Sequence, residues 1–219
     1  MQGSIEKIPS HEIVYRSVRD MILYGEFAPG QAVTIQGLGD QLGVSMTPVR
    51  EAIRRLTAEG ALEFMGNRRV CVPRMGEKRF AELVFARRAI EPRLAVMGSE
   101  GMNGAGIAAL ANADDALNAA IATGDVHGYM RFNHRFHFAL YEQSESRVLL
   151  PVTETLWLRF GPLFRIICGR YGTSNIIDHH EEAIDMLKKG DHAGVAGAIR
   201  ADIEQGFEII RRIHGWNAI

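Results

Sequence analysis

Apolar side chains in the first third of the chain recur at helical spacing and predict three short helices. Between residues 10 and 24 they return every three or four positions, which is the period of an amphipathic α-helix. A second helix is expected to begin at the N-cap residue Thr34 and a third at Ser45 or Thr47, with Gly43 in the turn between them. The third helix carries an apolar stripe for burial, made of Val49, Ala52, Ile53 and Leu56. Two helices joined by so tight a turn form a helix-turn-helix.

The pattern then changes to alternation. Residues 61–64 and 69–72 alternate around Gly66-Asn67, which predicts a two-stranded hairpin, and Pro73 ends its second strand. A hairpin directly after a helix-turn-helix forms a wing. We therefore expect a winged helix-turn-helix domain over residues 1–76.

Residues 77–219 read as helix throughout, so the fold class is mainly α, with an all-α six-helix bundle after the winged helix. The expected helices cover residues 79–100, 104–123, 125–143, 146–169, 174–189 and 191–214. Pro92 and Pro162 fall inside two of these segments and are expected to kink them.

Composition places the chain among globular proteins of the cytoplasm. Apolar residues make up 47% of the 219 positions, enough for a buried core. Cys71 and Cys168 fit neither a disulfide framework nor a CxxC metal motif, which favours a reducing compartment. The chain begins without the apolar core of a signal peptide, and no apolar run of about 20 residues predicts a membrane span.

The net charge of −1 hides a local basic region. Residues 43–74 hold six arginines against three acidic residues, as a DNA-contacting face can, although charge alone also fits an ordinary solvated surface. The first turns of a recognition helix reach base edges, and a wing reaches phosphates or the minor groove. The candidate DNA-binding residues are Ser45, Met46, Thr47, Arg50, Arg54, Arg68 and Arg69. Arg55 is instead expected to pair with Glu51 four residues earlier.

Two features of the helical part suggest chemistry. Asn133 and His137 are four residues apart and share one helix face. A histidine in a helical domain is more often a hydrogen-bonded structural residue than a metal ligand, and both interpretations stay open here. Arg87 lies one turn before Glu91, so its guanidinium either clamps the carboxylate of a ligand or forms a structural pair with Glu91.

The stretch Leu42-Gly43-Val44-Ser45-Met46-Thr47-Pro48-Val49-Arg50-Glu51-Ala52-Ile53-Arg54-Arg55-Leu56 resembles the winged helix of GntR-type repressors. The resemblance implies a homodimer that binds a palindromic double-stranded DNA operator. Two positions depart from the family pattern: Met46 replaces an arginine that the family uses on DNA, and Arg69 stands where the wing often has glycine. The operator preference is therefore left open.

Residues 80–215 resemble the helical FCD domain, the fatty-acid-regulator subgroup of that family. The matching pieces are Arg87-x-x-x-Glu91, Asn133-x-x-Phe136-His137, His180 followed by Ala183-Ile184, and Gly190-Asp191. The helix count resembles the vanillate-regulator branch. Many such domains bind a divalent metal, and by position its ligands here are Asn133, His137, His180 and Asp202.

That ligand set departs from the family at both ends, with Asn first instead of Asp and Asp last instead of His. An additional oxygen ligand tilts the preference slightly from zinc towards manganese or nickel, with zinc still the first choice. The resemblance thus implies a transcription regulator, most simply a repressor, that responds to a small organic acid held by the metal and by Arg87. The alternatives are a metal-free regulator with structural histidines and a metal-dependent enzyme, for which no motif supplies a general base.

Overall fold

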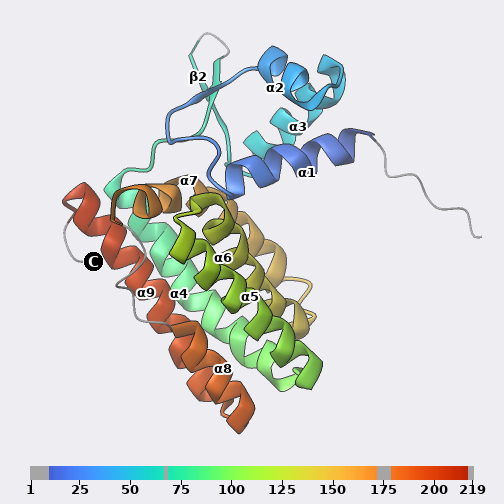
Figure 1. Cartoon of the computed structure of the whole chain (residues 1–219). Coiled ribbons are helices and arrows are strands. Elements are labelled where there is room, and N and C mark those ends of the chain that lie inside the picture. Colours follow the sequence, from blue (N-terminus) through green and yellow to red (C-terminus); the bar gives the residue numbers. More distant parts are fainter. Residues whose placement is uncertain (1–9, 67–68, 172–178, 217–219) are drawn as a thin grey trace, which may run out of the picture.

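The computed structural model describes residues 10–66, 69–171 and 179–216, with the backbone alone for residue 10 and residues 166–171. Its first part has the element order of a winged helix (Figure 1). The apolar stripe predicted for the third helix is buried. The elements are α1 (Ser10–Leu23), β1 (Ala32–Val33), α2 (Ile35–Leu42), α3 (Met46–Ala58), β2 (Glu63–Met65) and β3 (Arg69–Cys71).

The three strands form one antiparallel sheet in the order β1-β3-β2. Strands β2 and β3 are the predicted hairpin, with Phe64 opposite Val70. Strand β1 was not predicted. It is two residues long, too short to display alternation, and it exists because Ala32 and Val33 pair with Cys71 and Val70 across the sheet.

The turn between α2 and α3 is built by local chemistry. The Thr34 hydroxyl accepts a hydrogen bond from the Gly37 backbone N–H at 3.0 Å, which caps α2 as expected. Gly43 ends α2 with φ of 65°, a left-handed conformation that favours glycine. Ser45 occupies the N-cap position of α3, without a side-chain capping bond.

The rest of the described chain is helical. Its elements are α4 (Glu77–Glu100), α5 (Gly104–Thr123), α6 (Val126–Tyr141), the 3₁₀ turn η1 (Glu142–Ser144), α7 (Leu149–Tyr171), α8 (His179–Lys189) and α9 (His192–His214). Helix α4 packs against α6, α7 and α9, while α5 packs against α6 and α8. Pro92 and Pro162 lie inside helices that continue past them. Among the described residues, no helix is long and apolar enough to span a membrane.

The winged helix sits on one end of this bundle, where α1 packs against α7 (Figure 1). Buried apolar residues of both parts belong to one continuous core cluster. At the crossing, a side chain on Gly161 of α7 would overlap the carbonyl oxygen of Leu23 at the end of α1. A glycine there lets the two helices approach closely enough to share that core.

Candidate DNA-reading face and candidate metal centre

The solvent-facing side of α3 carries the candidate DNA-binding residues. Because Val49, Ala52, Ile53 and Leu56 are buried, the opposite side of the helix faces solvent. Ser45, Met46, Thr47, Arg50 and Arg54 are all exposed, Met46 to 47%. Arg69 is exposed at the start of β3, and Arg68 lies outside the described residues. The structure therefore brings the described candidates to the surface of the helix and wing.

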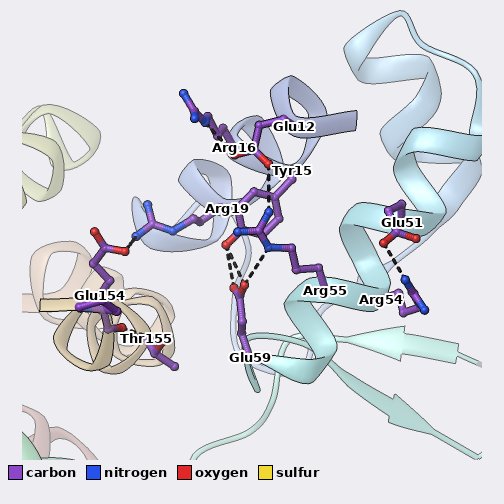
Figure 2. A network of polar contacts seen from close by, with 11 residues as sticks. Glu12, Tyr15, Arg16, Arg19, Glu51, Arg54, Arg55, Glu59, Glu154 and Thr155 are labelled. Carbon is purple, nitrogen blue, oxygen red and sulfur yellow. Dashed lines mark hydrogen bonds and ion pairs between the residues drawn. The ribbon is translucent and has the colours of Figure 1, made fainter. Parts of the chain in front are cut away.

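Two neighbouring arginines of α3 have different partners (Figure 2). Arg54 Nη2 lies 2.8 Å from Glu51 Oε1, and the Arg54 side chain is 78% exposed. Arg55 stacks its guanidinium 3.5 Å above the Tyr15 ring and bonds to Glu12 and Glu59. The expected Glu51–Arg55 pair is therefore wrong, because Arg54 takes Glu51 and Arg55 turns towards α1. Arg55 holds α1 against α3, whereas Arg54 stays accessible.

Three helices bring the candidate metal ligands together inside the bundle. His137 comes from α6, His180 from α8 and Asp202 from α9. His137 Nε2 lies 3.1 Å from Asp202 Oδ2, and His180 Nε2 lies 3.8 Å from Asp202 Oδ1. The two Nε2 atoms are 3.4 Å apart, and both histidines are buried. Residues spread over 65 sequence positions thus converge on one point.

These spacings fit the shell of one metal ion. Two ligand atoms that each lie about 2.1 Å from a tetrahedral zinc ion are about 3.4 Å apart. The Nε2–Nε2 distance equals that value, and the two nitrogen–oxygen distances of 3.1 and 3.8 Å lie on either side of it. Asn133, the fourth candidate, is buried one turn before His137 on α6 and lines the same small cavity as Asp202.

A buried chain of hydrogen bonds next to His137 determines which of its ring nitrogens carries the proton. The Tyr141 hydroxyl donates to Glu91 Oε2 at 2.8 Å and lies 3.1 Å from His137 Nδ1. A hydroxyl has one proton to donate, so towards His137 the oxygen accepts, and Nδ1 carries the hydrogen. Burial lowers the pKa of His137, which keeps the ring neutral despite the negative charge of Asp202 beside it. The lone pair of His137 Nε2 is then directed towards Asp202 and His180.

His180 has an acidic partner behind it that sequence reasoning missed. Its Nδ1 lies 3.1 Å from Oδ1 of Asp114 on α5. A carboxylate accepts hydrogen bonds, so Nδ1 carries the hydrogen and Nε2 presents its lone pair to the cluster. The ring also stacks on Phe136 with centroids 3.8 Å apart. No sequence signal linked Asp114 to a histidine 66 residues away, because only the packing of α5 on α8 joins them.

Asp202 carries the negative charge of the cluster. Burial alone would raise the pKa of its carboxyl, but the close contact with His137 and nearby positive charge, including that of Arg87, outweigh burial and lower the pKa to about 2. An ionised carboxylate beside two imidazole lone pairs is a donor set suited to a divalent cation such as zinc. The residues therefore fit the metal that the sequence suggested.

Arg87 is held by Glu91 in the structure. The pair is buried, with the side chains 3% and 0% exposed, and both guanidinium nitrogens Nε and Nη2 bond to the carboxylate. Glu91 also accepts from Tyr141 and from Trp157 Nε1 at 3.0 Å. Arg87 still lines a cavity of about 30 Å³ with Asn133 and Asp202, room for about one water molecule.

A winged helix whose third helix turns arginines towards solvent is built to bind DNA, so the fold defines a DNA-binding transcription regulator. Comparison with known families agrees: residues 11–72 match bacterial regulatory proteins of the gntR family, and residues 82–205, more than half of the chain, match the FCD domain. The chain belongs to the GntR family and carries an FCD domain.

Individual relatives agree with this assignment. The chain is 26% identical over 200 residues to the HTH-type transcriptional regulator McbR of Escherichia coli, covering 90% of each protein. It is 27% identical over 189 residues to the probable D-xylose utilization operon transcriptional repressor of Paenarthrobacter nicotinovorans, covering 81% of this chain and 80% of the relative. The solved structure of E. coli McbR superposes with a TM-score of 0.89 at 25% identity, covering 95% of this chain and all of that one. These relatives are transcription regulators, not enzymes.

Proposed function

We propose that this regulator is a homodimeric repressor whose operator affinity is set by a divalent metal and a small carboxylate in the helical domain. Residues 1–76 would form the DNA-binding domain and residues 77–219 the effector-binding and dimerisation domain. The observation that carries the proposal is the convergence of the buried His137 and His180 with the partly buried Asp202, at spacings that fit one ion. The description of one relative as a repressor supports the direction of regulation.

The operator would be read by α3 and the wing. Arg50 and Arg54 would contact bases or phosphates in the major groove, with Ser45, Met46 and Thr47 beside them. Arg68 and Arg69 would reach the neighbouring backbone or minor groove. Arg54 can exchange Glu51 for a phosphate at small cost, since their pair is exposed to solvent.

Dimerisation is supported by apolar side chains left on the surface of the helical domain. Phe85 on α4 is 75% exposed, and Val148 and Val152 near the start of the adjacent α7 are 72% and 43% exposed. Large exposed apolar residues on neighbouring helices are typical of an interaction surface. Two-fold symmetry would then place two recognition helices on a palindromic operator. Sedimentation of the wild type and of Phe85→Glu checks this surface.

The metal would be held by Asn133, His137, His180 and Asp202, with zinc the first choice and manganese or nickel next. When bound, a divalent ion supplies open coordination positions that attract a carboxylate. The cavity beside it is small, so a ligand larger than a formate-sized group needs side chains to move. Arg87 would share its guanidinium between Glu91 and the ligand carboxylate.

Metal content and zinc affinity of purified protein test the site. The wild type is expected to bind one divalent ion per chain, and His137→Ala to lose it. His127→Ala is the matched control, because His127 lies on the same helix with its side chain 51% exposed. A panel of small organic acids, added to operator-binding assays of the metal-loaded protein, tests the effector. A lack of response to every acid would contradict the sensor part.

A second candidate function is a metal-free regulator with structural histidines. It is favoured by the 3.1 Å distance from His137 Nε2 to Asp202 Oδ2, which suits a hydrogen bond if the metal-free ring carries a proton on Nε2. In that case the wild type and His137→Ala contain equally little metal, and His137→Ala is destabilised because Asp202 and Tyr141 lose a buried partner. The metal assay therefore separates the two candidates.

A further inference from the structure

Helix α7 lies between the small cavity and the winged helix, and its two sides serve different neighbours. Trp157, Phe160 and Phe164 line the cavity together with Arg87, Asn133 and Asp202. Arg159 and Arg165, which alternate with them along the helix, reach the winged helix instead. A single helix thus touches the candidate metal pocket and the winged helix at once.

Arg159 caps the recognition helix from outside. Its Nε donates a hydrogen bond to the backbone carbonyl of Glu59 at 3.0 Å, and Glu59 is the C-cap residue of α3. The last carbonyls of a helix have no partner within it and carry the negative end of the helix dipole. A guanidinium is therefore well suited to hold that end, and here it is supplied by the helical domain.

Arg165 holds the end of α1 in the same way. Its Nη1 donates to the carbonyls of Gly25 and Glu26, the latter at 2.9 Å, in the turn that follows α1. Arg19 of α1 adds an ion pair with Glu154 of α7 at 3.7 Å (Figure 2). The winged helix is thus tied to α7 at the ends of two of its three helices.

Glycines make room for both arginine side chains. Gly60 has φ of 73°, and a Cβ there would lie 2.8 Å from Arg159 Nη2. Gly25 has φ of 70°, and a Cβ there would lie 2.8 Å from the Cβ of Arg165. Both positions combine a left-handed backbone with a close approach of α7, so any other residue would disturb the contact.

We propose that α7 positions the recognition helix, with Arg159 and Arg165 as the anchoring residues, and that it transmits changes at the cavity to α3. A ligand that displaces Trp157 or Phe160 moves the same helix whose arginines hold α3 and α1. The anchoring part stands on these contacts alone, whereas the transmission part rests on the proposed function.

Hydrogen exchange of the full-length, metal-free protein tests the anchoring. In the double variant Arg159→Ala/Arg165→Ala, backbone exchange in residues 20–27 and 55–62 is expected to rise roughly tenfold or more, because each segment loses a charged hydrogen bond. Exchange in α2 serves as an internal reference for a folded domain. Arg212→Ala is the matched control, since Arg212 is 75% exposed and pairs within α9. Unchanged exchange in both segments would overturn the anchoring.

Operator affinity with and without zinc tests the transmission. Zinc is expected to shift the operator Kd of the wild type and of Arg212→Ala by roughly fivefold or more, within the range usual for allosteric coupling. In the double variant the shift is expected to shrink to less than about twofold, although zinc binds with unchanged stoichiometry. Arg159→Lys/Arg165→Lys, which retains a cationic donor at each position, is expected to recover part of the shift.

The outcomes separate the inference from the proposed function. If the wild type binds no zinc, the proposed metal site and the proposed transmission through α7 are both wrong. The exchange experiment still decides whether Arg159 and Arg165 anchor the winged helix. A wild type that responds to zinc and a double variant that responds equally would overturn the transmission while leaving the proposed function intact.

Discussion

The candidate DNA-reading face and the candidate metal pocket each contain a glutamate–arginine pair one helical turn apart, and the two pairs behave differently. Arg54 and Glu51 lie on the open side of α3, with side chains 78% and 50% exposed. Arg87 and Glu91 lie inside the bundle, with side chains 3% and 0% exposed. An exposed pair is screened by water and is readily exchanged for another partner, whereas a buried pair is costly to break. The same residue types therefore leave an arginine accessible to a ligand in one place and fix an arginine within the fold in the other.

The two regions also differ in how they are assembled. The exposed candidates on α3 come from one stretch of ten residues, 45–54, and a single helix presents them. The pocket draws on α4, α5, α6, α7, α8 and α9 through Glu91, Asp114, His137, Trp157, His180 and Asp202. A substitution on the exposed side of one helix affects few other contacts. A substitution in the buried network removes a hydrogen-bond partner from several residues at once.

The largest expected difference between the two pairs is in protein stability after the glutamate of each pair is replaced. Glu91→Gln is expected to destabilise the protein by about 3–5 kcal/mol, because Arg87 is left buried and charged without its counter-charge. Glu51→Gln, its matched control on the surface, is expected to cost about 0–1 kcal/mol. Urea unfolding of both variants measures the difference, and equal losses would contradict the comparison.

Removing one arginine from the reading face should affect DNA binding without affecting the fold. Arg50→Ala is expected to weaken operator binding by about 1–3 kcal/mol, as for an arginine that reads a base. Its thermal unfolding should match that of the wild type, since Arg50 is exposed. Lys188→Ala on α8 controls for the loss of one positive charge, its side chain being 59% exposed. Fluorescence anisotropy with labelled operator DNA gives the Kd, and an unchanged value would remove Arg50 from the contact set.

Residues that orient the candidate metal ligands are expected to affect zinc affinity nearly as much as the ligands themselves. Asp114→Asn is expected to weaken zinc binding by about 10- to 100-fold, because His180 loses the carboxylate that orients its ring. Asp115→Asn, its exposed neighbour on the same helix, is the control. Competition with a chromophoric chelator measures the affinities, and equal values for the two variants would show that Asp114 does not support the site.

Per pH unit, the smallest expected effect is a dependence of stability on pH from His134. Burial, together with the charges of Arg19, His137 and Arg87, lowers the pKa of His134 to about 3. The unfolded chain takes up a proton below about pH 6.5, whereas the folded chain does not until about pH 3. Stability is therefore full above about pH 6.5 and falls as the pH drops towards 3, by at most about 1.4 kcal/mol per pH unit for this group.

Urea midpoints between about pH 7 and about pH 5 measure that slope. His134→Phe keeps a ring stacked on Phe138, whose centroid lies 4.2 Å from that of His134, and removes the titrating group. In the variant, the slope of the unfolding free energy against pH should be smaller by the contribution of about one proton. A variant with the wild-type slope would show that His134 does not contribute to it.

Local sequence patterns predicted most of the helices and strands of the fold. Helical spacing and capping residues predicted α1 to α3 and the six helices of the bundle, with boundaries close to those in the structure. The expected start of the fifth bundle helix, at residues 174–178, lies outside the described residues. They missed β1, whose two residues are ordered only by pairing with β3. They also paired Glu51 with Arg55 rather than with Arg54, since spacing along a helix cannot register that Tyr15 and Glu12 of α1 attract Arg55.

By itself, the sequence determined the winged helix, the all-helical second part and the family, because hydrophobic periodicity and the motif around Arg50 are contiguous along the chain. Through resemblance, the sequence also proposed Asn133, His137, His180 and Asp202 as one set of metal ligands. Only the tertiary structure decided which of the eight histidines meet, which acid stands behind His180, and that Arg87 is committed to Glu91. The anchoring of α3 by α7 likewise depends on helix packing. Distances between side chains on different helices are set by how those helices cross and slide, and no local pattern records that geometry.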